Sequence, residues 1–334
     1  MESSARLLCV VVPCFDEELA VEHTYEELKR VLAQVTGWRH QLYFVDDGSR
    51  DGTLDALNRL AQHDRAVRVL SLSRNFGHQV AITAGLDHVD RRADAVLVMD
   101  ADLENPPALI PALLAELERG HDVVLGVRSG ARAVGLWKRV ASRAFYGLFN
   151  KLSDVPIAVD APEFFVLSRR AREALARMPE PHRFMRGMVA WIGFSRATVP
   201  YLPPARVRGR SKYTFARMLR FASDAIYGFS FAPVRLIVAL GALLLVASVA
   251  LGIAALAALP WRDVLGPGLF VASAVLLVGG LQLSALGVLG GYVARSFEAS
   301  RGRPLYVLKQ APDDPAEARL LEVTARSARS ASQN

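Results

Sequence analysis

The chain has 334 residues, enough for about two domains, and a formal net charge of +7. Apolar residues make up 52% of the chain and charged residues 22%, which excludes an intrinsically disordered protein. Two runs without charge, 236–259 and 267–294, are each long enough for a helix that crosses a bilayer. We therefore expect two transmembrane helices, which argues against both an ordinary soluble protein and a channel with many spans.

The first 130 residues alternate between short apolar runs and segments with helical spacing. Strands and helices are predicted in alternation, beginning with a strand, at residues 6–12, 17–35, 41–45, 53–62, 67–72, 80–88, 95–99, 109–119 and 123–126. This alternation, with nearly continuous apolar strands, is typical of an α/β fold with a mostly parallel sheet and helices on both faces. Ligands of such sheets bind beyond the carboxyl ends of the strands, so the polar residues that follow strands are the candidates for chemistry.

The first polar cluster follows the second predicted strand and begins with two adjacent carboxylates, Asp46 and Asp47. Carboxylates at a strand exit can accept hydrogen bonds from a nucleotide base and a ribose, and the neighbouring glycines allow close approach of a ligand. A turn in which Asp51 or Thr53 caps the next helix explains the same residues equally well. On its own, this cluster leaves both interpretations open.

A second acidic cluster follows the fourth predicted strand and contains Asp100 and Asp102. Two carboxylates one residue apart in an extended turn can both reach one hard cation, Mg²⁺ or Mn²⁺, which would share its remaining ligands with a diphosphate. Such a cation would neutralise charge on a leaving nucleoside diphosphate. The alternative is a capped turn before the helix that begins near Pro106, but two acidic strand exits in one sheet favour a nucleotide site.

Basic residues suggest where phosphates would bind. Arg128 and Arg132 follow the fifth predicted strand, and their forked donors suit a diphosphate, although solvated surface arginines explain them as well. Residues 206–220 carry six basic side chains and no acid, including Lys212, and could hold a lipid phosphate or attract anionic headgroups. Because the basic residues flank the uncharged runs and do not cover a separate face, we expect no nucleic-acid partner.

The charge flanking the two uncharged runs predicts their orientation. Both outer flanks are positive, whereas the short link carries only Arg262 and Asp263, so both ends of the pair are expected in the cytoplasm. We therefore predict a catalytic domain at 1–214 and an interfacial amphipathic helix at 215–232. A first span at 233–260, an external loop at 261–266 and a second span at 267–294 would follow. Residues 295–334 would form a partly disordered cytoplasmic segment.

Several motifs resemble those of known glycosyltransferases. Residues 11–18 (VVPCFDEE) resemble the opening strand of family 2 inverting glycosyltransferases, with the two acidic clusters at the expected later strand exits. A narrower resemblance, to bacterial polyprenyl-phosphate sugar transferases related to dolichyl-phosphate mannose synthase, is carried by 73–77 (SRNFG), 83–87 (TAGLD), 100–107 (DADLENPP) and 209–213 (GRSKY). Those enzymes have a GT-A domain followed by two C-terminal spans, and the resemblance covers about residues 7–305.

The resemblance implies an enzyme of the bacterial inner membrane, with its GT-A domain in the cytoplasm. This enzyme would transfer one sugar, with inversion, from a UDP- or GDP-linked donor to polyprenyl phosphate with the help of Mg²⁺ or Mn²⁺. Homo-oligomers remain open. Transfer to a glycan or protein hydroxyl, and a non-catalytic nucleotide-binding scaffold, are the alternatives.

The resemblance also implies roles for individual residues. The nucleotide pocket would be lined by Pro13, Glu17, Asp46 and Asp47. The sugar nucleotide and the metal would be held by Asp100 and Asp102, and the phosphates by Arg128, Arg132 and Lys212. Asp160 matches an acid near the reacting centre of the family.

Two departures from the family pattern concern this same region. A lysine is common in the family where this chain has His78, and the family usually reads Asp-Ala-Gly-Asp-Phe where residues 160–164 read DAPEF. The choice of donor and the role of Glu163 are therefore left open. The sequence gives no reason to assign His78 to a metal.

Overall fold

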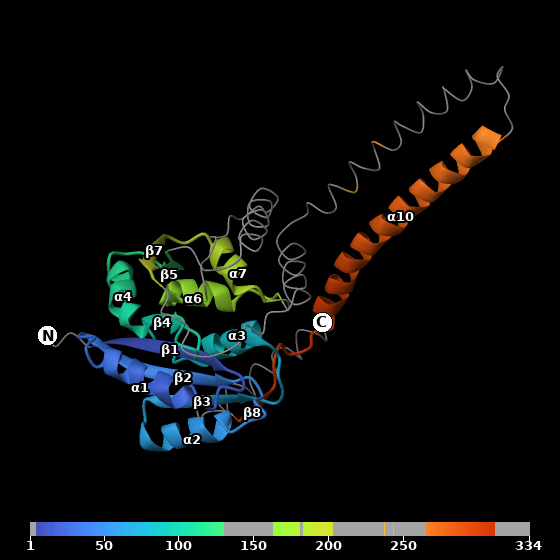
Figure 1. Ribbon diagram of the computed structural model, residues 1–334. Coiled ribbons are helices and arrows are strands. Elements are labelled where there is room, and N and C mark those ends of the chain that lie inside the picture. The colour runs from blue at the N-terminus through green and yellow to red at the C-terminus, as the bar shows by residue number, and fades with distance from the viewer. Residues whose placement is uncertain are drawn as a thin grey trace, which may run out of the picture. The chain divides into compact units, whose positions relative to one another are not determined.

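The computed structural model describes residues 5–129, 163–180, 183–202, 237, 243 and 265–310. The chain divides into two compact units. One contains the sheet with its helices and includes residues 304–310, and the other contains the long helix α10 (Leu265–Ser300) (Figure 1).

Strands and helices of the sheet unit follow one another as the hydrophobic spacing predicts. Their bounds are β1 Arg6–Cys14, α1 Val21–Leu32, β2 Trp38–Asp46, α2 Thr53–His63, β3 Val67–Leu72, α3 His78–His88, β4 Ala95–Val98, a 3-10 turn at Pro107–Leu109, α4 Ile110–Glu118 and β5 Val123–Arg128. Later described elements of this unit are β6 Phe165–Ser168, α6 Arg169–Ala176, α7 Met185–Trp191, β7 Arg196–Tyr201 and β8 Leu308–Gln310.

The described strands form one mixed sheet in the order β7-β5-β6-β4-β1-β2-β3-β8. The pairs β1–β2, β1–β4, β2–β3 and β5–β7 are parallel, whereas β6 is antiparallel to β4 and β5, and β8 is antiparallel to β3. The prediction of an α/β fold is confirmed, but the sheet is mixed, because β6 and β8 run antiparallel to their neighbours. Both antiparallel strands are short and come from segments where no strand was predicted.

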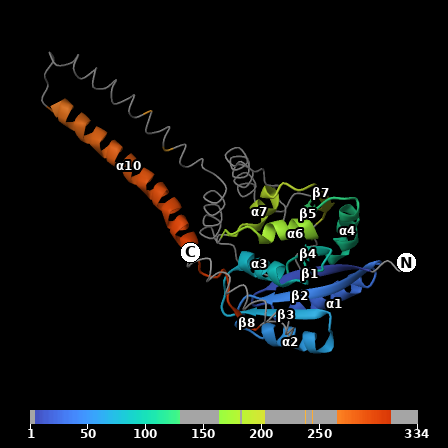
Figure 2. The same cartoon turned by 180° about the vertical axis from the view of Figure 1, so that it is seen from behind.

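Helices cover both faces of the sheet, as the continuous apolar strands predict (Figures 1 and 2). Alternate β1 residues such as Leu8 and Val10 join one buried cluster with side chains of α1, α2 and α4. On the opposite face, α3 packs on β1 and β2 and contacts α6. There Gly85 is required, because a Cβ at this position would lie 2.3 Å from Cγ1 of Val11.

The first helix begins later than its spacing predicts. Residues after β1 form a turn in which Asp16 has a φ of +54° and Glu17 accepts hydrogen bonds at its carbonyl from Ala20 and Val21, so α1 starts only at Val21. In turn, β1 extends to Cys14 and includes Pro13. Its pairing with β4 ends at Val11, so the missing N–H of Pro13 lies beyond that ladder.

The regions around the uncharged runs are described only in part. Residues 215–232 lie outside the described residues, as do all of 233–260 apart from 237 and 243, whereas 267–294 form part of α10. None of the helices in the described part of the chain has the length and apolarity needed to cross a membrane.

Residues 304–310 lie beside β3, at the side of the sheet opposite β7. Leu308 and Gln310 pair with Leu72 and Ser71 of β3, and the Tyr306 hydroxyl lies 3.1 Å from Oδ2 of Asp87. A strand was not expected here, since three residues carry too little pattern to indicate one.

Candidate functional site

The carboxyl edge of the sheet contains a reversal of strand order. From β1 the chain continues to β2 and β3 on one side, whereas β4 lies on the other side of β1. In open α/β sheets, ligands bind outside the carboxyl ends of the strands at such a reversal. The loops that follow β1, β2, β3 and β4 all begin at this edge, and they carry most of the residues predicted for the site.

Asp46 and Asp47 lie at this edge, but both are buried and face protein donors. Asp46 accepts hydrogen bonds from the backbone N–H of Ser49 and the hydroxyl of Ser71, each at 3.0 Å. Asp47 accepts from the backbone N–H groups of Phe76 at 2.7 Å and Gly77 at 2.9 Å. Burial raises the pKa of Asp47 in spite of these bonds. Every oxygen of this pair therefore has a donor from the protein, and the pair joins the loops after β2 and β3.

A glycine allows those two loops to touch. Gly48 has a φ of +68°, and a Cβ there would lie 2.4 Å from the carbonyl carbon of Arg74. The guanidinium of Arg74 lies 4.2 Å from the centre of the Phe76 ring. The turn is thus built by backbone contact as well as by the carboxylate of Asp47.

The loop after β1 is tied to the same edge. The Asp16 N–H donates to the Ser49 hydroxyl at 3.1 Å, and Oδ1 of Asp16 accepts from the Arg50 N–H at 2.9 Å. Glu17 donates its N–H to the hydroxyl of Thr53 at 2.9 Å. Two predicted residues therefore lie beside Asp46 and Asp47: Glu17, and the buried Pro13 near the end of β1.

Asp100 and Asp102 follow β4 and differ from the first acidic pair in their exposure. Asp100 is 30% exposed, and its Oδ2 accepts from the amide of Asn105 at 3.2 Å. Asp102 is exposed, and its Oδ1 accepts from the Glu104 N–H at 3.0 Å. Desolvation, with the nearby charges of Asp100 and Glu104, raises the pKa of Asp102. Leu103, which lies between Asp102 and Glu104, has a φ of +55°, a conformation that costs a leucine about 1–3 kcal/mol.

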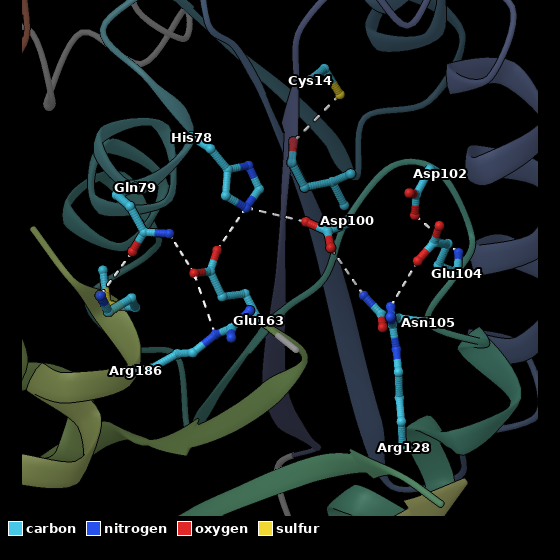
Figure 3. A network of polar contacts seen from close by, with 12 residues as sticks. Cys14, His78, Gln79, Asp100, Asp102, Glu104, Asn105, Arg128, Glu163 and Arg186 are labelled. Atoms are coloured by element: carbon cyan, nitrogen blue, oxygen red, sulfur yellow. Dashed lines mark hydrogen bonds and ion pairs between the residues drawn. The ribbon is translucent and has the colours of Figure 1, made fainter. Parts of the chain in front are cut away.

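A polar network connects Asp100 to two residues to which the sequence analysis gave no role, His78 and Glu163 (Figure 3). Nε2 of His78 lies 3.2 Å from Oδ1 of Asp100 and 2.7 Å from Oε2 of Glu163. Glu163 is 5% exposed, accepts a hydrogen bond from the Gln79 amide, and lies 3.8 Å from Nε of Arg186.

The charges of this network sustain one another. The His78 side chain is 46% exposed; desolvation by the surrounding protein alone would lower its pKa, but the charges of Glu163 and Asp100 outweigh this effect and raise the pKa above its usual value. Burial alone would raise the pKa of Glu163, but the charge of His78 and its contact outweigh it and lower the pKa to about 2. The pair is therefore charged at neutral pH.

Arg128 lies on the other side of Asp100. Its guanidinium contacts Oε2 of Glu104 at 3.0 Å and donates through Nε to the Tyr201 hydroxyl at 3.1 Å. That hydroxyl in turn donates to Oδ1 of Asn105 at 2.7 Å. Arg128 therefore supports the loop after β4 from β5, with β7 contributing the tyrosine.

The remaining predicted residues, Arg132, Asp160 and Lys212, lie outside the described residues. Those that the sequence reasoning missed are Asn105, Tyr201, His78 and Glu163. Glu163 had no strand signal around it, and nothing in the sequence links it to His78. The only local hint was that both positions depart from the family pattern.

The donor set fits a hard divalent cation that is shared with a phosphate ligand. Within the described residues, no three His, Cys, Asp or Glu side chains gather as a complete metal site. Asp100 and Asp102 offer two carboxylates, and in the same part of the chain the second oxygen of Asp102 has no hydrogen-bond donor. Mg²⁺ in proteins is often bound by one or two carboxylates plus substrate phosphates and water.

Comparison with known proteins gives consistent relatives. Residues 9–175 match the family described as Glycosyl transferase family 2. The glycosyltransferase YkcC of Bacillus subtilis is 34% identical over 90% of this chain and 93% of its own length. The bactoprenol glucosyl transferase of Shigella phage SfV is 36% identical over 90% of this chain and 98% of its own, and the prophage bactoprenol glucosyl transferase homolog of Escherichia coli K12 is 35% identical over 91% and 98%.

Among solved structures, glucosyl-3-phosphoglycerate synthase from Mycobacterium tuberculosis, in complex with Mn²⁺, UDP and glucosyl-3-phosphoglycerate, is similar to this chain with a TM-score of 0.44. The sequence identity is 22%, over 66% of this chain and 78% of that one.

Proposed function

Because the chain belongs to glycosyl transferase family 2, and is a glycosyltransferase with an α/β GT-A-like fold, we propose that it transfers one sugar from a nucleoside diphosphate to polyprenyl phosphate. The observation that carries this proposal is the similarity, over nine tenths of the chain, to a bactoprenol glucosyl transferase and to a bactoprenol glucosyl transferase homolog. Asp100 and Asp102, at the reversal of strand order, would hold the cation that the diphosphate of the donor shares.

In this proposal the donor lies across the loops after β1, β2 and β4. Pro13, Glu17, Asp46 and Asp47 line the nucleotide pocket, the two buried acids by shaping its loops. Asp102, with Asp100 beside it, would hold Mg²⁺ or Mn²⁺. When bound, such a cation supplies positive charge that stabilises the departing diphosphate.

The chemistry needs little acid–base help from the protein. A phosphate oxygen of the acceptor attacks the anomeric carbon as the bond from that carbon to the diphosphate oxygen breaks, which inverts the configuration. The second pKa of a phosphate monoester is about 6, so the nucleophile is already largely ionised at neutral pH. We assign Asp160 to orienting the acceptor or the sugar, and Arg128, Arg132 and Lys212 to the phosphates of donor and acceptor.

Anchoring in the membrane is part of the proposal, and it is supported by the sequence alone. The acceptor carries a long prenyl chain that stays in the bilayer, and the uncharged runs with basic outer flanks would keep the GT-A domain at the cytoplasmic surface of a bacterial inner membrane. Residues 206–220, with six basic side chains, would then lie where the lipid phosphate emerges.

The test is a product assay with the purified full-length chain in detergent. Labelled UDP- and GDP-sugars are offered with polyprenyl phosphate, with and without Mg²⁺ or Mn²⁺, and the label is followed into the lipid extract. We expect a lipid-extractable sugar phosphate that requires polyprenyl phosphate. Label that appears only in protein or glycan would overturn the proposed acceptor, and no transfer from any donor would overturn the proposed reaction.

A further inference from the structure

We propose that His78 is a positioning residue for Asp100 and that Glu163 acts on Asp100 through His78. This inference rests on the proposed function, because it treats Asp100 as part of the site for donor and metal. It concerns two positions at which the chain departs from the pattern of the resembling family.

Sheet register places two carboxylates opposite each other. In the antiparallel pair of β4 and β6, Val98 is the partner of Phe165. Asp100 lies two residues after Val98, and Glu163 lies two residues before Phe165, so the two acids stand at opposed positions just beyond the ladder. Like charges at such positions repel each other, so a hydrogen-bond donor placed between them would favour the arrangement.

His78, the first residue of α3, lies between the two acids. Its Nε2 is 2.7 Å from Oε2 of Glu163 and 3.2 Å from Oδ1 of Asp100, so one nitrogen bridges both acids (Figure 3). The other oxygen of Asp100 is held by Asn105 at 3.2 Å. The orientation of the Asp100 carboxylate is therefore set on one side by its own loop and on the other side by His78.

The far end of the bridge is rigid. Glu163 is buried and accepts from the Gln79 amide, and the carbonyl of that amide accepts from the Met185 N–H of α7 at 2.8 Å. Since Asp47 binds the N–H of Gly77, the residue before α3, the helix that carries His78 is itself fixed. Glu163 can thus hold the imidazole in one place.

Asp102 makes no comparable contact in the described part of the chain, because its carboxylate accepts only the N–H of Glu104. The two acids of the pair therefore differ: Asp102 is open to a ligand, and Asp100 is aimed by its neighbours. Removing a group that orients a metal ligand commonly costs about 10–100-fold in metal affinity.

The experiment measures binding of Mn²⁺ in the presence of UDP to the purified full-length chain, by electron paramagnetic resonance and by calorimetry. We expect His78→Leu to weaken this binding by at least about tenfold. His78→Gln should keep most of it, because its amide N–H can occupy the place of Nε2. Tight binding by His78→Leu, or a loss in His78→Gln as large as in His78→Leu, would overturn the role of His78.

A matched control is the pair of His121 and Glu116, whose Nε2 and Oε2 are 3.7 Å apart. His121 precedes β5 and so lies at the opposite edge of the sheet. His121→Leu should leave binding unchanged. An equal loss in His121→Leu and His78→Leu would mean a general effect of losing a histidine, and would overturn the inference.

Two further variants address folding and the role of Glu163. The double variant His78→Leu with Glu163→Gln removes the buried charge together with its partner, so it should fold and still bind weakly. Glu163→Gln alone should weaken binding several-fold, but should add little to His78→Leu, since coupled residues are not additive. Equal effects of Glu163→Gln in both backgrounds would overturn its action through His78.

The inference and the proposed function can fail separately. A chain that binds Mn²⁺ with UDP in the predicted order of variants, yet transfers no sugar to polyprenyl phosphate, would support the positioning role and overturn the proposed acceptor. An unaltered chain that binds no Mn²⁺ with UDP would overturn the positioning role, whatever it transfers.

Discussion

The loops after β2 and β4 carry similar pairs of aspartates but use them differently. Asp46 and Asp47 are buried, and all four of their oxygens accept hydrogen bonds from the protein. Asp102 is exposed and accepts one, from the N–H of Glu104. Acidic residues at a strand exit therefore differ in role: the carboxylates of Asp46 and Asp47 hold loops together, whereas Asp102 keeps one oxygen without a donor in the described part of the chain and can serve a ligand.

The largest effect is expected at Asp102. Asp102→Asn should lower sugar transfer by roughly two to three orders of magnitude, because the amide is a poor ligand for a hard cation and carries no charge. The melting temperature should stay close to that of the unaltered chain, since the carboxylate of Asp102 supports little of the fold. Activity that survives this change would remove Asp102 from the site.

At the buried pair of Asp46 and Asp47, a substitution is expected to lower the stability of the fold. Asp47→Ala leaves the half-buried N–H groups of Phe76 and Gly77 without their acceptor, which should destabilise the sheet unit by about 2–4 kcal/mol. Chemical or thermal unfolding measures this loss, and Asp102→Ala is its control, with a change within about 0.5 kcal/mol. Equal losses in the two variants would abolish the distinction between the pairs.

A substitution at Gly48 tests the close approach of the loops after β2 and β3, which Asp46 and Asp47 also hold together. Gly48→Ala should cost about 2–3 kcal/mol, because its Cβ meets the backbone of Arg74 and its φ is +68°. Gly37 provides the control, since it has a φ of +80° but no atom within 4 Å of a built Cβ. Gly37→Ala should cost only about 1 kcal/mol, and if it costs as much as Gly48→Ala, the loops do not depend on close approach.

The smallest effect concerns an occupied carboxylate outside both loops. Hydrogen bonds from the Ala66 N–H, Lys29 and Tyr25 lower the pKa of Asp64 to about 2. A lowered folded-state pKa gives stability that is present above the unfolded value near 4 and is lost as the pH falls through about 2. The unaltered chain should therefore lose about 1 kcal/mol more than Asp64→Asn between pH 4 and pH 2, allowing for solvent screening. Parallel pH curves for the two proteins would contradict this.

Most of the sheet could be predicted from the sequence, because β1 to β5 and their helices each carry a local period. β6, β7 and β8 could not. β6 and β8 are short, and all three strands pair with partners that are distant in sequence, such as Val98 for Phe165 and Leu72 for Leu308. The same limit applies to the site.

The position of the acids after their strands follows from the α/β pattern, but their exposure does not. Ser71 donates a hydrogen bond to Asp46, and the N–H of Phe76 donates one to Asp47. Nothing in the sequence around Ser71 or Phe76 indicates these contacts. His78 and Glu163 meet across the fold without any motif that joins them.

The place of β8 also limits the order in which the sheet can form during synthesis. β7 and β8 are the two edges of the described sheet, and β3 gains its outer partner only from residues 308–310. During synthesis, the N–H and C=O groups along the outer side of β3 stay open while all of α10 is translated, and an unpaired edge is where a nascent chain can pair with the wrong strand. Within the described residues, this edge of the sheet can therefore be completed only after α10 has been translated.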